Sequence, residues 1–143
     1  MGMIKKLLNM PPVQILMIPE AIWLTGYYRF RILYRPFSEL SPKIGTLGEE
    51  SPLDIQLPPE VMQVRKIVRA VSKRMPWTCN CMVRALTMKT MLARRAIGST
   101  LYMGVALDES GNMEAHAWLR CGSKYISGET EMDRFTVTAV YGP

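Results

Sequence analysis

The sequence predicts an α+β fold in which helices are followed by a run of antiparallel strands. Two observations lead to this prediction. Between residues 60 and 96 the apolar residues recur at the three- and four-residue spacing of amphipathic helices, whereas after residue 100 they follow a period of two. With 143 residues, of which 48% are hydrophobic and 21% charged, the chain can bury one core and is not compositionally disordered.

The N-terminal part is expected to be a helical appendage followed by a linker. Residues 12–35 read as one helix or two short ones, and Pro36 ends the pattern. Residues 38–59 contain repeated proline, glycine and serine, a composition typical of a loop. We therefore divide the chain into an N-terminal segment, residues 1–57, and a main domain, residues 58–143.

Two helices open the predicted main domain. Residues 60–74 place valine and isoleucine on one face, and Pro76 ends this helix because the residue before a proline avoids the helical region. A second helix is expected over about residues 79–96. Thr78 is its expected N-cap and Gly98 its expected stop.

Four strands complete the expected fold, over residues 101–107, 113–120, 124–127 and 135–141. The segments between them, residues 108–112 and Gly122-Ser123, have the composition of turns. Helices followed by such hairpins favour helices packed on a short antiparallel sheet.

The tight turn at Gly122 allows a prediction of strand register. If the two turn residues are Gly122 and Ser123, the hairpin places His116 directly opposite Glu129 on the same side of the sheet. A one-residue bulge would instead place Gly128 or Ser127 opposite His116.

Cys81 and His116 are the residues that point to chemistry. A cysteine in the first turn of a helix meets unsatisfied N–H groups and the positive end of the helix dipole, which stabilise the thiolate. His116, the single histidine, lies in a predicted strand, and packing of this strand on the helix start would join the two side chains. Glu129 is our candidate to orient the imidazole, with Asp133 or Ser127 as alternatives.

Two motifs resemble a known family. The run CMVRALTMKTMLARR at residues 81–95 is followed by a strand and then by Ala-His-Ala-Trp-Leu at residues 115–119. This pair resembles the transglutaminase-like leader peptidases of lasso-peptide biosynthesis, the microcin-processing group, over about residues 58–143. The resemblance implies a papain-like or transglutaminase-like cysteine protease core with Cys81 as nucleophile and His116 as base.

The resemblance also bears on the third catalytic residue. The acidic residue of the family lies about a dozen positions after the histidine. In this chain the twelfth position is Gly128 and the thirteenth is Glu129, so the family's acid does not map cleanly. The resemblance leaves Cys79 and Cys121 outside the catalytic set.

The function implied by the resemblance is that of a cytoplasmic cysteine endopeptidase, without a cofactor, that cuts a lasso-peptide precursor between leader and core. Trp77, Asn80 and Trp118 are then expected at the substrate. The implied partners are the leader peptide, a separate leader-binding recognition-element protein and the lasso cyclase, which uses the freed core amine. We expect the aromatic residues of positions 22–34 and the loop to residue 58 to meet the leader-binding protein.

Composition leaves other functions open. The chain has 18 Lys and Arg against 12 Asp and Glu, and its net charge of +6 suits an acidic partner. A basic module that binds nucleic acid or a membrane surface is therefore an alternative. The basic residues are scattered over helices without an RNA-binding signature, so we expect no nucleic-acid partner. Prolines interrupt the N-terminal apolar run, and no transmembrane helix is expected.

A structural zinc site is the other alternative. Three cysteines are an odd number, which disfavours a disulfide scaffold and favours a reducing compartment. Four soft ligands are available in Cys79, Cys81, His116 and Cys121, although Cys-x-Cys is tighter than the usual ligand spacing. For a cysteine enzyme, the sequence leaves open whether water or an amine accepts the acyl group.

Overall fold

The computed structural model describes residues 2–143, apart from the side chains of Met3, Lys6 and Leu7. It confirms the predicted α+β class. In chain order, its elements are α1 (Gly2–Leu8), α2 (Pro12–Tyr34), α3 (Phe37–Ile44), β1 (Thr46–Leu47), α4 (Pro59–Ser72), α5 (Cys81–Ala93), β2 (Thr100–Leu107), β3 (Met113–Cys121), β4 (Lys124–Ser127), a 3₁₀ turn η1 (Met132–Arg134) and β5 (Thr136–Gly142).

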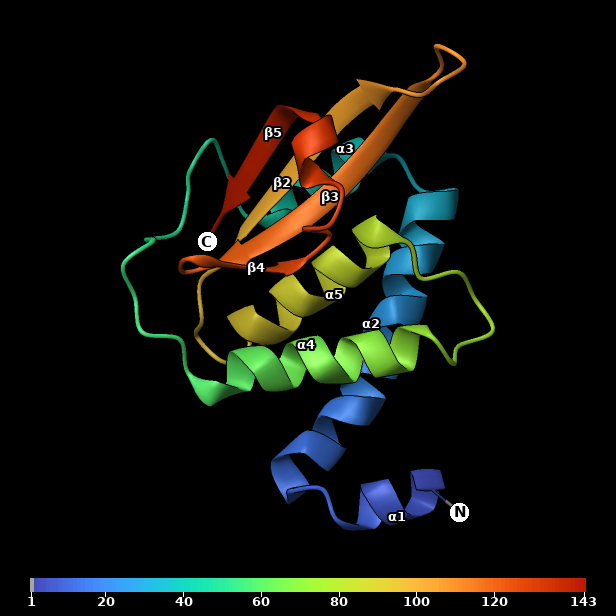
Figure 1. The fold of residues 1–143 in the computed structure, drawn as a ribbon, viewed down its shortest axis with the longest axis vertical. Helices are drawn as coiled ribbons and strands as arrows, with labels where there is room; N and C mark the ends of the chain where they lie inside the picture. The colour runs from blue at the N-terminus through green and yellow to red at the C-terminus, as the bar shows by residue number, and fades with distance from the viewer. Residues whose placement is uncertain (1) are drawn as a thin grey trace.

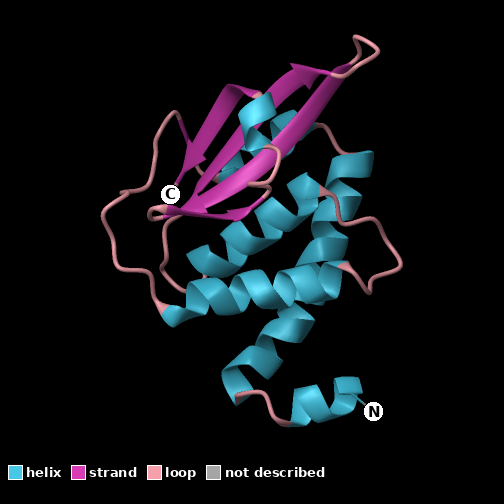
Figure 2. Cartoon of the chain, viewed as in Figure 1, coloured by secondary structure: helices cyan, strands magenta, loops and turns pink. Residues whose placement is uncertain are grey.

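The strands form one antiparallel sheet in the order β1-β5-β2-β3-β4. The central hairpin of β2 and β3 is the longest pairing, and β5 returns to pair with the other edge of β2. Figure 2 shows helices α2, α4 and α5 lying together beside the strands. In Figure 1, α5 lies between α4 and the sheet, and it packs against both.

The core lies between these two layers because strand alternation and helix periodicity turn their apolar residues toward each other. On β3, Ala117, Leu119 and Cys121 belong to this core, whereas His116 does not. α5 is almost entirely buried, which explains why its apolar residues surround the helix instead of following one stripe. Core residues include Val61, Val64, Ile67, Val68, Ala85, Leu86, Met88, Met91, Leu92, Leu101 and Ile126.

The N-terminal segment contributes to the same core. The region predicted as one or two helices is a single helix, α2, which contains Pro19. Met17, Ala21 and Leu24 of α2 are buried against α4 and α5. Figure 1 shows α1 and the first turns of α2 extending away from the rest of the molecule. The division at residue 57 stays a prediction.

The predicted linker is partly regular structure, which corrects the sequence interpretation. α3 forms despite Pro42 because tertiary contacts hold it: Leu40 is buried in the core, and Ser41 hydrogen-bonds Tyr141 of β5 over 2.8 Å. The two residues of β1 add an edge to the sheet by pairing with β5. Local composition favoured a loop, and long-range packing overrides it here.

The predicted ends of the second main-domain helix were also wrong by a few residues. α5 begins at Cys81, and its N-cap is Asn80 rather than Thr78. Its C-terminal turn closes through Ala96, which has a positive φ of 59°, before the chain reaches Gly98. The Ile97 N–H donates to the Leu92 carbonyl at 2.9 Å, which is the return bond of a left-handed helix end.

Candidate active site

Cys81 is the first residue of α5, and the cap leaves part of the helix start free. The Asn80 side-chain oxygen accepts the Val83 N–H at 3.0 Å, and its main-chain oxygen accepts the Arg84 N–H at 3.0 Å. The N–H groups of Cys81 and Met82 have no hydrogen-bond acceptor within residues 2–143. A half-buried thiol therefore stands beside two unpaired donors at the positive end of a helix dipole.

The His116 imidazole is held in one orientation. Its Nε2 lies 2.8 Å from the Gly128 carbonyl oxygen, and since a carbonyl only accepts, the Nε2–H is the donor. The neutral ring then carries its lone pair on Nδ1. Phe135 stacks on the ring at a centroid distance of 4.9 Å, and Trp118 at 5.8 Å. This ring is therefore prepared to accept a proton at Nδ1.

A bulge in β4 sets this contact and corrects the predicted register. The hairpin pairs Arg120 with Tyr125 as predicted, but the register then shifts and the ladder ends with Leu119 opposite Ser127. His116 is consequently not paired with Glu129, and the expectation based on an unbroken ladder was wrong. A one-residue bulge is present, but it shifts the register in the opposite direction, so neither Gly128 nor Ser127 is paired with His116. Gly128 reaches the imidazole through its main-chain carbonyl, beyond the end of the ladder.

Gly128 is suited to this close approach. Its φ of +74° lies in the left-handed region, and a Cβ at this position would collide with the Ala117 carbonyl oxygen of β3. Only a glycine brings its carbonyl to His116 without moving β3. Gly128 is the twelfth residue after His116, about where the family that these motifs resemble has its acidic residue. In this chain a main-chain carbonyl, and not an acidic side chain, contacts the imidazole from that position.

Glu129 is directed toward α4 instead. Its Oε1 pairs with the Arg65 guanidinium at 2.7 Å, and Arg65 also donates to the Ile126 carbonyl at 3.1 Å. The two alternative residues do not orient the imidazole either. In the described chain, neither Asp133 nor Ser127 makes a side-chain hydrogen bond to His116. A catalytic role for Glu129 stays a prediction.

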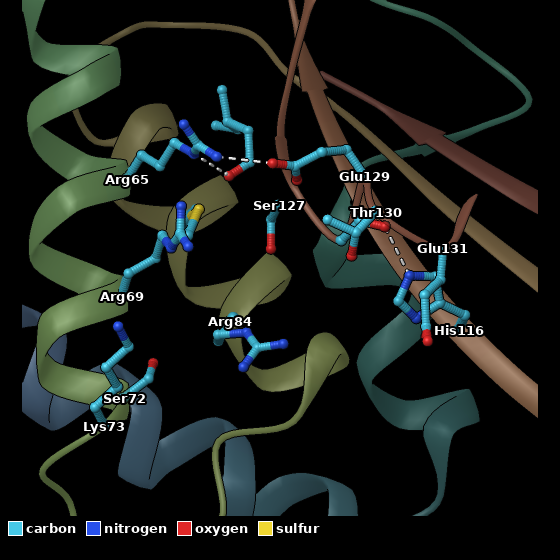
Figure 3. Close-up of a pocket in the computed structure, with 13 residues that line it drawn as sticks. Arg65, Arg69, Ser72, Lys73, Arg84, His116, Ser127, Glu129, Thr130 and Glu131 are labelled. Atoms are coloured by element: carbon cyan, nitrogen blue, oxygen red, sulfur yellow. Dashed lines mark hydrogen bonds and ion pairs between the residues drawn. The ribbon is translucent and has the colours of Figure 1, made fainter. Parts of the chain in front are cut away.

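A cavity of about 280 Å³ brings several of these residues together. Figure 3 shows His116 and Glu129 at this cavity, with Arg65 and Arg69 reaching in from α4. α5 contributes Arg84 and Met88 to its wall. The cavity is therefore built by both main-domain helices, β3 and the segment that follows β4.

Cys81 belongs to the same face of α5 as this wall but does not line the cavity. It precedes Arg84 by three residues and Met88 by seven, the spacing that repeats on one face of an α-helix. No hydrogen bond joins the Cys81 thiol to His116 in the described chain. By strand alternation, His116 shares a face of β3 with Trp118, opposite to the face that contributes to the core.

The three residues expected at the substrate have structural contacts. The Trp77 indole N–H donates to the Thr25 hydroxyl of α2 at 3.2 Å, and Asn80 caps α5. Trp118 is 4% exposed and stacks between His116 and Tyr102, so it supports the imidazole from behind. Their contact with a substrate stays a prediction.

The zinc alternative finds no support in the geometry. Within residues 2–143, no three His, Cys, Asp or Glu side chains lie close enough together to hold a metal ion. Cys121 is fully buried in the core and burial raises the pKa of its thiol, which keeps it protonated and inert. The four cysteine and histidine residues considered as ligands therefore do not form one site.

The sequence did not predict the residues that surround His116. The bond from His116 to Gly128 depends on a β-bulge, which pairing rules alone do not locate. The twelve-residue spacing was the one available signal. Arg65 and Arg84 lie on predicted helices, and nothing in the periodicity distinguishes them from the other basic residues.

None of the helices described in residues 2–143 is long and apolar enough to cross a membrane. No curated protein and no solved structure matches the chain significantly. The family model of the Transglutaminase-like superfamily matches residues 24–140, which include the candidate cysteine, the histidine and every strand except the last two residues of β5. The chain therefore belongs to the transglutaminase-like superfamily, whose members commonly use a cysteine for hydrolase or transferase chemistry.

Proposed function

We propose that this protein is a cysteine peptidase that removes the leader from a lasso-peptide precursor. The observation that carries the proposal is an oriented imidazole at His116, on a strand that packs against α5, the helix whose open start carries Cys81. The resemblance of residues 81–95 and 115–119 to leader peptidases supplies the substrate, and membership of the superfamily supports the cysteine chemistry.

The proposed reaction uses groups whose positions have been described. His116 Nδ1 takes the proton of the Cys81 thiol, and the thiolate attacks the carbonyl carbon of the scissile peptide bond. The unpaired N–H groups of Cys81 and Met82 donate to the oxyanion that forms. The imidazolium then returns the proton to the leaving amine, and water hydrolyses the acyl-enzyme to restore the thiol.

The mechanism requires Cys81 and His116 to come within hydrogen-bond reach when substrate is bound. Catalytic hydrogen bonds are often long in the free enzyme and tighten only in the complex with substrate. Two features support such an approach. His116 lines the cavity to which Arg84 and Met88 of α5 contribute, and β4 ends at Ser127, which leaves the neighbouring edge of β3 uncovered by a strand.

Cleavage of a candidate precursor, with and without a leader-binding protein, tests the proposal by mass spectrometry. We expect one cut between leader and core. C81A and H116A should each lower kcat/KM by at least about 10³-fold, because removing a nucleophile or its base removes the covalent route. C79S is the matched control and should cleave normally. Cleavage by C81A would refute the mechanism. A product that ends in a new amide, formed with an amine, instead of a carboxylate, formed with water, would indicate a transferase.

We place the leader-binding partner on the exposed aromatic residues of α2. Trp23 is 67% exposed, Phe30 55% and Tyr34 70%, and the three recur at offsets of seven and four, the spacing of one helix face. W23S/F30S should weaken partner binding without changing thermal stability, because neither residue is in the core. L107S, which changes another exposed apolar residue, is the control. Unchanged affinity of W23S/F30S would place the interface elsewhere.

A further inference from the structure

The cavity beside His116 has a basic wall that the proposed reaction does not use. Arg65 and Arg69 of α4 and Lys73, its C-cap, follow one another at four-residue intervals, and Arg84 of α5 lines the same cavity. Like charges at this spacing lie side by side on a helix and weaken it. Figure 3 shows these side chains on the walls of the cavity, with Glu129 and Glu131 on another side.

Most of this positive charge lacks an acidic partner within the described chain. Arg65 is the exception, because Glu129 neutralises it at 2.7 Å. Arg69 and Lys73 make no side-chain hydrogen bond or ion pair with residues 2–143, and Arg84 donates only to the Cys79 carbonyl at 3.3 Å. Three cations therefore face the cavity without a matching carboxylate.

The basic surface continues beyond the cavity along α4. A second hollow of about 380 Å³ follows the same helix and adds Lys66 and Arg74 to the cations, with Met62 and Ala70 as its apolar floor. The two hollows share Arg65, Arg69 and Lys73. A mainly basic strip, residues 65–74, thus follows α4 beside the cavity that His116 lines.

The spacing of this strip matches an extended peptide. Four residues of α-helix rise about 6 Å, and two residues of an extended chain span about 6.6 Å. An extended segment lying along α4 therefore presents alternate side chains to Arg69 and Lys73, which, unlike Arg65, have no acidic partner among residues 2–143. Guanidinium groups recognise carboxylates through paired hydrogen bonds, which favours Asp or Glu at those positions.

We infer that the basic strip of α4, together with Arg84, binds a segment of the substrate peptide that carries Asp or Glu at alternate positions. This inference rests on the proposed peptidase function and names the class of peptide that the site takes. The strip holds the segment extended beside His116, so the acidic positions lie within a few residues of the scissile bond.

A peptide fits the strip better than a nucleic acid does. No Phe, Tyr or Trp is among the residues that line either hollow, so bases have no aromatic ring of these kinds to stack on. Glu129 and Glu131 line the cavity and would repel a continuous phosphate backbone. A peptide needs no aromatic ring to stack on, and its uncharged residues can lie beside Glu129 and Glu131 while its carboxylates meet the cations.

Peptide binding to the inactive variant C81A tests the inference separately from catalysis. Fluorescence anisotropy would compare a labelled peptide with glutamate at two alternate positions, the same peptide with glutamine, and a single-stranded oligonucleotide. We expect the acidic peptide to bind about tenfold more tightly than its glutamine version at low salt. R69Q/K73Q in the C81A background should remove that preference, whereas R35Q/K43Q, with the same charge change outside both hollows, should keep it.

Each outcome decides one question. Equal affinity for the two peptides, or an equal loss in R35Q/K43Q, overturns the inference. An oligonucleotide that binds as tightly as the acidic peptide and is lost in R69Q/K73Q assigns the strip to nucleic acid instead. If the protein binds the acidic peptide but never cleaves a precursor, the inference about the basic strip stands and the proposed peptidase function is refuted. If it cleaves a precursor but shows no preference for acidic peptides, the peptidase function stands and the inference is refuted.

Discussion

The two ends of α5 differ in how completely their polar groups are hydrogen-bonded to the rest of the protein. Near its C-terminal end, Lys89 is 6% exposed and donates to the carbonyls of Ser99 and Gly142, each at 3.0 Å. At the N-terminal end, Cys81 and Met82 keep unpaired N–H groups, and the thiol is half-buried. The helix is therefore anchored to the sheet at one end, while the other end is left available for a substrate.

We therefore expect the two ends of this helix to differ in role, with one end important for stability and the other for catalysis. Lys89 joins α5 to Ser99, which precedes β2, and to Gly142, the last residue of β5, so changes at this end should act on unfolding. Changes around the open end and its histidine should act mainly on turnover. Three predictions sharpen the comparison, in order of expected effect.

G128A should cause the largest loss. The added Cβ meets the Ala117 carbonyl, so the Gly128 carbonyl moves away from His116 and the imidazole loses its orientation. We expect kcat to fall by about 10–100-fold, with a smaller change in KM, because substrate contacts are retained. The pH dependence of kcat should change as well.

G111A is the control for backbone strain. Gly111 also has a positive φ, of +81°, but a Cβ there meets nothing within 4 Å. Its cost is therefore the left-handed backbone alone, about 1 kcal/mol, with normal turnover. If G128A keeps full activity, the Gly128 carbonyl does not position the imidazole.

K89M should alter the pH dependence of stability and leave turnover unchanged. Burial lowers the pKa of Lys89 to about 8 in the folded chain, from 10.5. Between these values the unfolded chain binds more protons than the folded one, so this group makes the free energy of unfolding rise with pH. Below the folded pKa both states are protonated and the contribution is constant.

Urea unfolding of wild type and K89M at a series of pH values checks this. The difference in unfolding free energy between the two proteins should grow in favour of wild type as pH rises from about 8 to about 10. Parallel curves would show that Lys89 titrates alike in both states. A loss of turnover in K89M would contradict the separation between the two ends of α5.

E129Q should have the smallest effect. Glu129 pairs with Arg65 through side chains that are 31% and 25% exposed, and such ion pairs contribute less than about 1 kcal/mol. We expect kcat to stay within about threefold of wild type, since the main chain orients His116. A tenfold loss of kcat with a shifted pH profile would make Glu129 the orienting acid after all.

The strength of local signals explains how much of the fold was predictable. The sequence interpretation found α4 and β4 almost to the residue, because an amphipathic face and a Gly-Ser turn are local patterns. It missed α3, which Leu40 and the bond from Ser41 to Tyr141 stabilise through distant contacts. Asn80 and Thr78 are both good N-caps, and sequence alone does not decide between them.

The candidate site was also predictable only in part. Residue type and the predicted place in a helix or a strand identified Cys81 and His116 as candidates. The partner of the imidazole depends on a bulge and a positive φ at Gly128, which arise only when β4 is paired with β3. The charge of the cavity likewise depends on the approach of α4 to α5, which brings Arg69 near Arg84 at one cavity.

Alkylation of the two half-buried cysteines tests the central claim most directly. Peptide mapping after brief treatment with iodoacetamide at mildly acidic pH measures the rates at Cys81 and Cys79 in one sample. We expect Cys81 to react at least about tenfold faster than Cys79, because its sulfur lies beside two unpaired N–H groups at the start of α5. Equal rates at both cysteines would contradict this.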